Sequence, residues 1–341
     1  MRNQLFHRAL MALITLSVCA AGFVAAAPES RIVQRKVVTL PKSLMLSKVN
    51  DQGVGAGASN PLRPTPVTAK LSGTSAKIHR LTPQNGLAYS LNNAGVSVGV
   101  VLNGEKEVPV VFRANGATEP ISTAVTVWPS HINDSGIIVG EIDGATYNTS
   151  IAARVIAGNV EIYLDTRPME PGYRTQGSTA IDIASDGTTL VQLYSVRNKV
   201  GIEVLPRQVI LWHTDGTSTP IAEDAWGSAI SDNGRFVVGI QQASPIRWEI
   251  SGSAVTTTHV TEPSGATYTY GIDINNTGAM VGEAEYTAIY WPTPGEPIAV
   301  TQMARFKKSV QALSAISLTN KGGILVQCRK GTTYFQSYLR P

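Results

Sequence analysis

The sequence predicts an all-β fold, a seven-bladed β-propeller, and three observations carry this prediction. A short pattern of an aliphatic residue, Asn or a small residue, two further residues and Gly recurs seven times along the chain. The glycines of successive copies are 42, 41, 51, 47, 44 and 44 residues apart. No helical periodicity of useful length appears after residue 27, so the repeated unit consists of strands.

Each copy of the pattern predicts a β-hairpin. Asn and Asp side chains favour tight turns, and Gly takes the left-handed backbone conformation that other residues resist. Apolar runs flank the turn, as the two strands of a hairpin require. The copies are Val49–Gly53, Leu91–Gly95, Ile132–Gly136, Ile183–Gly187, Ile230–Gly234, Ile274–Gly278 and Leu318–Gly322. We expect their seven leading aliphatic side chains to be buried between blades.

Two further strands follow the hairpin in each period. A third apolar run often ends in Trp, as in Ile210–Trp212, Ile246–Trp248 and Ala288–Trp291, and we expect these tryptophans in the core. A turn that contains Gly in most copies and a short last strand, such as Thr219–Ile221, complete the unit. Four antiparallel strands in each repeat, joined by short turns, are typical of a propeller blade, whereas a sandwich would not repeat so often.

The two ends of the chain predict how the ring closes. The seventh copy supplies three strands before the chain stops at Pro341, so its blade lacks a fourth strand. The segment 31–40 holds an apolar run, Arg35–Leu40, that belongs to no copy. We expect this run to pair with Tyr334–Leu339 as the outer strand of blade seven, because that pairing removes an exposed edge. Residues 28–341 then form one propeller domain.

Residues 1–27 have the pattern of a secretory signal peptide. Arg2 and Arg8 precede an uncharged apolar run, and Ala25–Ala27 provides a small-residue cleavage site. A membrane anchor and a lipoprotein modified at Cys19 are the alternatives. The apolar run is short for an anchor, and Val18 stands where a lipoprotein has a small residue. We therefore expect a protein that is secreted or periplasmic and has no membrane span.

The composition excludes several classes of protein. Apolar residues make up 43% and charged residues 15%, which excludes a disordered polyelectrolyte. The 28 Lys and Arg exceed the 24 Asp and Glu by only four, or by two without the leader, so we expect no nucleic-acid partner. Cleavage would leave Cys328 without a disulfide partner in the chain, so packing must hold the fold.

The repeat resembles a known family. The Ile-Asn-x-x-Gly turn, the apolar run that ends in Gly, and the later Trp with its Gly turn are similar to the HAF-type "probable extracellular repeat" family of secreted bacterial proteins. Ala184–Gly187 and Ser231–Gly234 also resemble the Ser-x-Asp-Gly turn of TolB-type propellers. The resemblance covers nearly the whole mature chain and implies export and a propeller-like repeat, but no established reaction. The chain lacks the His-Ala-Phe usual on the third strand, so no functional residue is carried over.

Catalytic and metal-binding motifs are weak. The Gly95–Gly99 stretch matches a hydrolase nucleophile elbow around Ser97, but Gly136–Gly140 and Gly278–Gly282 hold the same two glycines, which therefore belong to the repeat. The Asn-Asp turns have too few oxygen ligands for a calcium loop, and the histidines lack metal spacing. We therefore assign no catalytic residue, no metal and no cofactor.

Three aromatic residues are candidates for binding. Trp128, Trp226 and Tyr270 each lie eight residues before a turn glycine, which places them early in the innermost strand, at the rim of the central channel. Aromatic side chains at such a mouth stack on sugar rings or flat ligands. The alternative is that they cap the blade core.

Polar residues recur three positions further along the same strands. They include His131, Asp182 and Asp273, which we expect to line a polar channel because buried polar groups need partners. They form either a buried hydrogen-bond ring or part of a site for binding or acid–base chemistry.

Two insertions predict long loops at the channel mouth. Thr166–Ser178 joins blades three and four, and Leu193–Arg207 joins the second and third strands of blade four. They carry Tyr173, Arg174 and Arg197, a basic cluster that suits an anionic or sugar-bearing ligand. Plain solvated loops are the alternative.

These observations predict an exported, monomeric binding module that recognises carbohydrate or a protein partner through the channel-mouth face. A secreted hydrolase or lyase that acts on polysaccharide through Asp182, Asp273 and His131 is one alternative. A purely structural envelope protein is the other.

Overall fold

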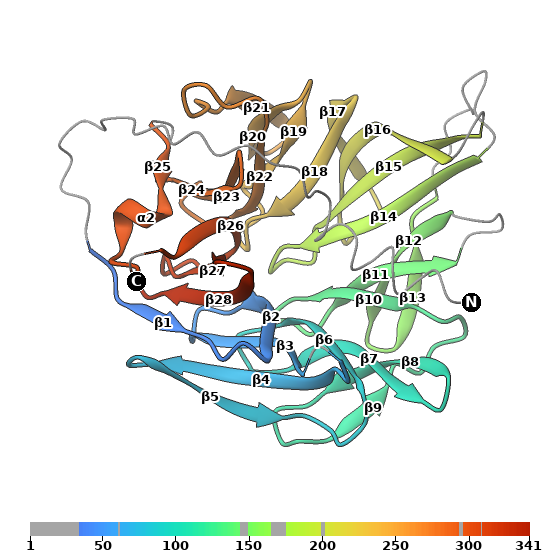
Figure 1. Cartoon of the computed structure of the whole chain (residues 1–341). Coiled ribbons are helices and arrows are strands. Elements are labelled where there is room, and N and C mark those ends of the chain that lie inside the picture. Colours follow the sequence, from blue (N-terminus) through green and yellow to red (C-terminus); the bar gives the residue numbers. More distant parts are fainter. Residues whose placement is uncertain are drawn as a thin grey trace.

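The chain forms a ring of seven antiparallel sheets with four strands each, as Figure 1 shows, so the predicted seven-bladed propeller is confirmed. The computed structural model describes residues 34–60, 62–143, 149–164, 175–198, 202–292, 296–307 and 309–341. The expected signal peptide, residues 1–27, lies outside this part. Within the described residues, no helix has the length and apolar character needed to cross a membrane.

The strands follow one another in chain order from the inner to the outer edge of each blade. Blade one contains β2 (Leu44–Val49), β3 (Val54–Ser59), β4 (Thr65–Ser72) and β5 (Ser75–Arg80). Blade two contains β6 (Gly86–Leu91), β7 (Ser97–Asn103), β8 (Lys106–Phe112) and β9 (Thr118–Pro120). Blade three contains β10 (Trp128–Ile132), β11 (Ile138–Asp143), β12 (Ser150–Ile156) and β13 (Asn159–Ile162). Blade four contains β14 (Thr175–Ile183), β15 (Thr189–Asn198), β16 (Ile202–Trp212) and β17 (Ser218–Glu223).

The last three blades follow the same plan. Blade five contains β18 (Ala225–Ile230), β19 (Phe236–Gln241), β20 (Ser244–Ser251) and β21 (Ala254–His259). Blade six contains β22 (Thr269–Ile274), β23 (Met280–Ala284), β24 (Thr287–Trp291) and β25 (Ile298–Ala299). Blade seven contains β26 (Gln311–Leu318), β27 (Ile324–Lys330), β28 (Thr333–Leu339) and, from the other end of the chain, β1 (Val37–Thr39).

The first hairpin of each blade turns at the repeated pattern. All seven turn glycines have φ between +67° and +91°, the left-handed region that the sequence pattern requires. In blade one the Asn50 N–H donates to the Val54 carbonyl, and the Gly53 N–H donates to the Asn50 carbonyl. The Asn50 side-chain oxygen also accepts the N–H of Val54 at 3.0 Å. The pattern therefore encodes a three-residue hairpin loop closed by its own Asn.

The ring closes between the first and the last described strands. β1 pairs antiparallel with β28, with Val38 opposite Tyr338, and Figure 1 shows these two strands side by side in one blade. Val38 is completely buried, so the closing strand also contributes to the core. The predicted closure of blade seven by the N-terminal segment is confirmed.

The core consists of seven apolar clusters, each between two neighbouring blades. The leading aliphatic of every turn packs into the cluster shared with the preceding blade: Val49, Leu91, Ile132, Ile183, Ile230, Ile274 and Leu318. Trp212, Trp248 and Trp291 are at most 4% exposed and pack the same way. Because each cluster needs two blades, every blade is stabilised by its neighbours.

Two local expectations are wrong. The expected loop Leu193–Arg207 is mostly an extension of β15 and β16, which pair from Thr189–Trp212 out to Asn198–Ile202. The charged residues of this insertion led to the prediction of a loop, although apolar and polar residues alternate at the outer end of the hairpin, as they do in strands. The repeat also predicts a last strand at Glu296–Val300 in blade six, but this strand stops at Ala299, and Val300 begins the helical turn α2 (Val300–Met303).

Candidate functional site

A β-bulge in each innermost strand positions the residues around the channel. The register between the first two strands shifts in every blade, and the residues just after the shift are Lys48, Ser90, His131, Asp182, Ala229, Asp273 and Ser317. A bulge inserts one residue into a strand and re-aims the side chains beyond it. In blade one the residues before and after the inserted residue, Leu46 and Lys48, pair with the neighbours Gly57 and Ala56 and therefore face opposite sides of the strand.

Glycines on the second strands make room for these bulges. A Cβ on Gly282 would overlap the backbone carbonyl oxygen of Tyr270 on the neighbouring inner strand. Gly57, Gly99, Gly140 and Gly239 stand in the same relation to their inner strands. The second glycine of the repeated pattern is therefore required by the close approach of two backbones.

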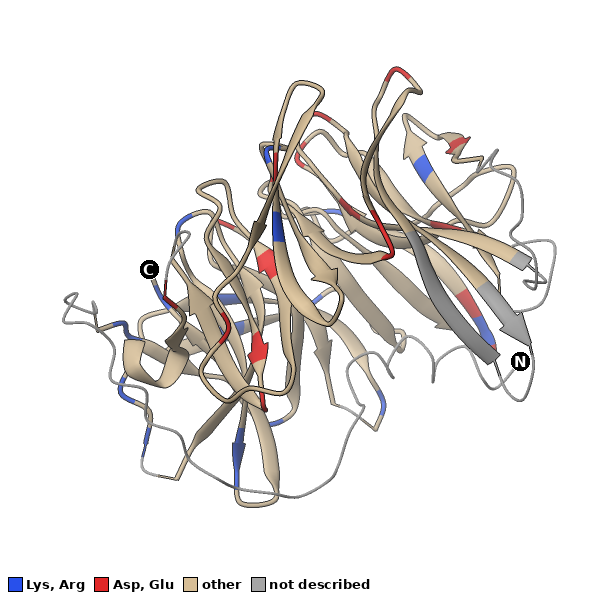
Figure 2. Cartoon of the chain, turned by 90° about the horizontal axis from the view of Figure 1, so that it is seen from above, with Lys and Arg blue, Asp and Glu red and all other residues tan. Residues whose placement is uncertain are grey.

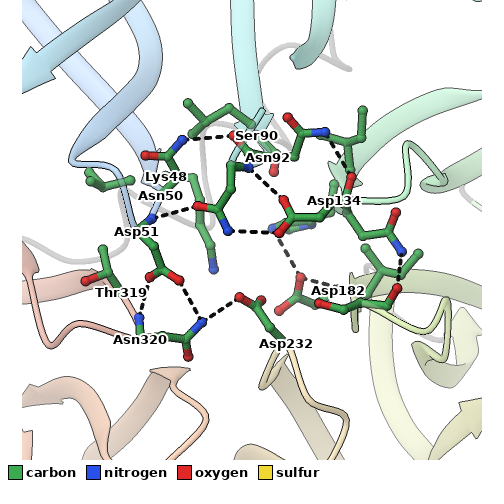
Figure 3. A pocket seen from close by; sticks show the side chains of 18 of the residues that line it. Lys48, Asn50, Asp51, Ser90, Asn92, Asp134, Asp182, Asp232, Thr319 and Asn320 are labelled. Atoms are coloured by element: carbon green, nitrogen blue, oxygen red, sulfur yellow. Dashed lines mark hydrogen bonds and ion pairs between the residues drawn. The ribbon is translucent and has the colours of Figure 1, made fainter. Parts of the chain in front are cut away.

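Five of the residues after the bulges line a small polar cavity at the end of the channel where the seven turns meet (Figure 3). Its volume is about 60 Å³, room for a few water molecules and several times less than a typical ligand pocket. Lys48, His131, Asp182 and Asp273 lie in its wall, together with residues of the turns. We call this end of the channel the turn mouth.

Hydrogen bonds between neighbouring turns form a ring around the turn mouth. Five backbone N–H groups donate to a side-chain oxygen of the next blade at 2.7–3.0 Å: Asn233 to Asn276, Asn276 to Asn320, Asn320 to Asp51, Asp51 to Asn93 and Asn93 to Asp134. The Asn133 side chain donates to the Ala184 carbonyl, and the Ser185 N–H donates to the Asp232 carbonyl, which completes the circle. The polar turn residues thus tie the blades together.

The two buried carboxylates of the channel also join neighbouring blades. Asp273 accepts the N–H of Ile274 in its own blade and, at 2.8 Å, the N–H of Leu318 in blade seven. Asp182 does the same for Ile183 and Ile230. These N–H groups lie beside the bulges, where the regular strand ladder is interrupted, so the carboxylates satisfy backbone donors that the bulges release.

Lys48 supplies a positive charge for this set of acids. Its Nζ lies 3.1 Å from Oδ2 of Asp273, and in Figure 3 the side chain points into the cavity. Burial alone would lower the pKa of the Lys48 amine, but the carboxylates of Asp273 and Asp182 raise it above its usual value. Lys48 is therefore a permanent cation held between acidic residues of three blades.

The other titratable groups of the cavity are shifted by burial. Burial lowers the pKa of His131, and the Asp182 carboxylate, 3.9 Å from Nε2, offsets this only in part. Burial raises the pKa of Asp232 to about 6, although Lys48 opposes the shift. The Asn320 side chain donates to Asp232 at 2.6 Å and to Asp51 at 3.1 Å, so Asn320 bridges two carboxyl groups across the mouth.

The arrangement at the turn mouth suits structure better than catalysis. An acid–base pair needs access to a substrate bond, whereas Asp182 and Asp273 are at most 6% exposed and hold two backbone N–H groups each. Within the described part of the chain, no group of three His, Cys, Asp or Glu residues has the arrangement of a metal site. His131, Asp182 and Asp273 do converge, as a polar set with partners.

The opposite end of the channel carries a different set of side chains. Two positions before the inserted residue of each bulge lie Met45, Leu87, Trp128, Thr179, Trp226, Tyr270 and Ser314. We call this end of the channel the aromatic mouth. Met45 is 50% exposed and Tyr270 is 42% exposed, and both tryptophans are partly exposed. None of the seven belongs to the wall of the turn-mouth cavity.

The predicted site residues therefore separate into two groups. Trp128, Trp226 and Tyr270 lie at the aromatic mouth, whereas His131, Asp182 and Asp273 line the cavity at the turn mouth. The three residues between the two positions carry each strand from one end of the channel toward the other, so the two sets lie apart.

Most of the predicted basic cluster lies outside the described residues. Tyr173 and Arg174 lie outside the described residues, and Arg197 is described only as a backbone position of β15. Figure 2 shows the Lys and Arg positions interspersed with Asp and Glu among the blades.

Sequence reasoning missed several residues of both mouths. Asp232 occupies a repeated turn position of its copy, so alignment of the copies was the available signal, whereas Lys48 stands at the same recurring inner-strand position as His131 and was not missed. Tyr268 and Tyr286 pack against each other beside Tyr270, but they come from different segments and share no repeat position. Only the folded hairpin brings them together.

The fold is similar to that of solved propellers at low sequence identity. A structure of YCF48 bound to a D1 peptide matches with a TM-score of 0.55 and 12% identity, over 92% of this chain and 97% of that one. The β-propeller domain of Cps50 (Swd1) from Myceliophteria thermophila matches with a TM-score of 0.54 and 11% identity, over 90% and 100%. A chain of the mitotic checkpoint complex matches with a TM-score of 0.50 and 11% identity, over 94% and 99%.

These similarities establish the architecture of the chain. No protein-family model matches the sequence, and no curated protein matches it either. At identities near one residue in eight the likeness is one of fold, and function lives in sites placed on folds. The chain is thus a seven-bladed β-propeller, a scaffold that its structural neighbours use in protein complexes.

Proposed function

We propose that the protein is an exported binding module that holds a segment of a protein partner at the aromatic mouth. The observation that carries this proposal is the exposure of large apolar side chains around one end of the channel, with Met45 at 50% and Tyr270 at 42%. Exposed apolar and aromatic residues that gather at one place mark interaction sites. The propeller supplies a rigid support for them.

The composition of the aromatic mouth favours a protein partner over a carbohydrate. Sugar sites combine flat aromatic faces with many polar groups, whereas Met45 and Leu87 offer flexible aliphatic surface. Met, Trp and Tyr are the residues enriched in the cores of protein interfaces. The neighbour YCF48 was solved with a peptide, which agrees with this use of the fold.

The hydrolase alternative is less well supported. Its acid and base candidates, Asp182, Asp273 and His131, lie in a cavity of about 60 Å³, too small for a polysaccharide segment. The carboxylate oxygens of Asp182 and Asp273 accept backbone N–H groups of neighbouring blades, so a structural role accounts for these two residues.

Peptide display tests the binding proposal directly. Random twelve-residue peptides displayed on phage would be selected on the protein, and their affinities compared among wild type, Trp226→Ala and Tyr334→Ala. Tyr334 is a matched control because it is an exposed aromatic residue on β28, away from the inner strands. We expect at least a tenfold loss of affinity in Trp226→Ala and none in Tyr334→Ala, with thermal melting to show that both variants fold.

Other outcomes would change the proposal. Peptides that bind Trp226→Ala as well as wild type would remove the aromatic mouth from the function. A glycan array that gives ligands lost in Trp226→Ala, where no peptide is selected, would make the partner a carbohydrate. Export is tested separately: protein recovered from the periplasm or medium should begin at Pro28, and recovery with residues 1–27 intact would contradict cleavage.

A further inference from the structure

Blade six and its flanking loops have an unusual distribution of charge. No Lys or Arg occurs between Arg247 and Arg305, a stretch that supplies β22 to β25. Six acidic residues fall in the same stretch: Glu249, Glu262, Asp273, Glu283, Glu285 and Glu296. Asp273 pairs with Lys48 and Glu249 with Arg235, so the other four carry the negative charge of this surface. A surface of one charge sign attracts a partner of the opposite sign.

Three tyrosines gather where this stretch reaches the aromatic mouth. The ring centroids of Tyr268 and Tyr270 are 5.4 Å apart, and those of Tyr268 and Tyr286 are 5.7 Å apart with the planes nearly perpendicular. Tyr270 and Tyr286 are 42% and 39% exposed, so the cluster presents aromatic surface to solvent. The negative face of an aromatic ring attracts cations.

An unusual turn holds Tyr286 in this cluster. Glu285 and Tyr286 have φ of +47° and +57°, a conformation in which Asn and Gly are preferred over bulky residues. The Glu285 carboxylate accepts the Thr267 N–H at 2.7 Å and also the Thr267 hydroxyl, and thereby ties the turn to the segment that precedes β22. The equivalent turn of blade five, at Gln242 and Ala243, has the same conformation, so the contact between Glu285 and Thr267 is the feature particular to blade six.

Glu283 places a carboxylate beside the tyrosines. It lies opposite Tyr270 in the register of β22 and β23, and it is partly buried. Burial raises the pKa of Glu283, whereas hydrogen bonds with Ser314 and Tyr268 oppose the shift, and no Lys or Arg of the described residues contributes to it. A partly buried carboxylate without a cation nearby is stabilised when a ligand brings one.

We propose that Tyr268, Tyr270, Glu283 and Tyr286, the blade-six cluster, bind the Lys or Arg side chain of the partner segment. This inference rests on the proposed function and names one feature of the partner. The aliphatic stem of such a side chain packs on the tyrosine rings, and its charge meets Glu283. The absence of basic residues from the surrounding stretch leaves this charge without a competitor in blade six.

A small-molecule titration tests the cluster without a known partner. The probes are N-acetyl-lysine methylamide and its uncharged counterpart N-acetyl-norleucine methylamide, and the readout is the ring resonances of selectively labelled tyrosines. We expect the lysine probe to shift the resonances of Tyr268, Tyr270 and Tyr286 saturably, and the norleucine probe to bind at least fivefold more weakly. Glu283→Gln, which keeps the shape of the side chain, should reduce the affinity for lysine to that for norleucine, whereas Tyr334→Ala should leave it unchanged.

The selected peptides separate this inference from the proposed function. We expect replacement of their Lys or Arg by norleucine to weaken binding at least fivefold in wild type and not at all in Glu283→Gln. Peptides that need Trp226 but tolerate norleucine would overturn the blade-six inference and leave the function intact. A lysine probe that binds the cluster while the peptides ignore the mouth would do the reverse. Equal binding of the two probes, or tighter binding of choline than of lysine, would also overturn the inference.

Discussion

The two mouths of the channel are built by the same seven strands and differ in what their side chains do. At the turn mouth nearly every polar group has a partner in the next blade, and the cavity that remains is about 60 Å³. At the aromatic mouth large apolar side chains such as Met45 and Tyr270 stay in contact with water. The comparison teaches that Asp, His and Lys have a structural role in this channel, and that exposed apolar surface indicates the candidate binding site.

Strand geometry explains why the two mouths differ. The bulges release backbone N–H groups, and Asp182, Asp273 and Ser317, which follow three of the bulges, accept such groups. The position two residues before each inserted residue has no released N–H groups to accept, and it is Met, Leu, Trp, Thr, Trp, Tyr and Ser in successive blades. One end of the channel is constrained by the backbone, and the other is free to specialise.

The largest effect should come from loss of Asp273. Asp273→Ala leaves the Ile274 and Leu318 N–H groups and the Lys48 ammonium without their acceptor, and we expect it to reduce the free energy of unfolding by about 3–5 kcal/mol. Urea denaturation followed by circular dichroism measures this loss. Asp273→Asn keeps one acceptor oxygen and should lose less. A loss below 1 kcal/mol in the Ala variant would contradict a structural turn mouth.

The bulges themselves can be tested through a glycine. Gly282→Ala would force the added Cβ against the Tyr270 carbonyl, and we expect a loss of about 2–3 kcal/mol. Gly252→Ala is the control, since a Cβ there meets no atom within 4 Å and only its φ of +60° is unfavourable. If both variants lose the same stability, close backbone approach at Gly282 is not what the repeat requires.

The parts of this fold that could be predicted are those written in local residue patterns. The Asn and Gly of each turn determine the hairpins, and the orphan run Arg35–Leu40 indicates the closing strand. The bulges could not be predicted because the inserted residues share no single chemical character: Ser47, Tyr89, Ser130, Ile181, Ser228, Ile272 and Ile316. The second glycine of the pattern was a visible sign of them, but its meaning depends on the partner strand.

The candidate sites depend on the same unseen bulge. Trp226, Tyr270 and the polar set were correctly placed on the inner strands, but a period of three residues alone does not say which end of a channel each one reaches. The blade-six cluster was beyond prediction for another reason. Tyr268 lies before β22 and Tyr286 in the turn after β23, and only the pairing of these strands brings the two rings together.

A pH-dependent difference in stability should come from Asp232 at the turn mouth. The fold raises the pKa of Asp232 to about 6, above the unfolded value near 4, so the neutral carboxyl favours folding. This contribution is complete below pH 4 and is lost as the pH rises through about 6. Asp232→Asn is neutral at all pH values. Because Asp232 is exposed and solvent screens its charge, we expect the variant to be more stable than wild type by only about 1 kcal/mol or less at pH 8, and unchanged at pH 4.

Thermal and urea unfolding of wild type and variant at the two pH values measure this difference, in which the titration of His131 cancels because both chains contain it. Asn can still accept the hydrogen bond that the Asn320 side chain donates, so the bridge across the mouth is kept. A variant that is less stable than wild type at pH 8 would show that the Asp232 charge stabilises the ring.

The smallest effect should come from the aromatic mouth. Tyr270 is 42% exposed, so Tyr270→Ala removes less buried area than a core substitution, and we expect a loss of about 1 kcal/mol or less in urea denaturation. Met45→Ala, at 50% exposed, should behave in the same way. Peptides selected on wild type should nevertheless lose binding to Tyr270→Ala. If Tyr270→Ala costs as much stability as Asp273→Ala, the tyrosine is part of the scaffold, and the division of the channel into a structural mouth and a binding mouth is wrong.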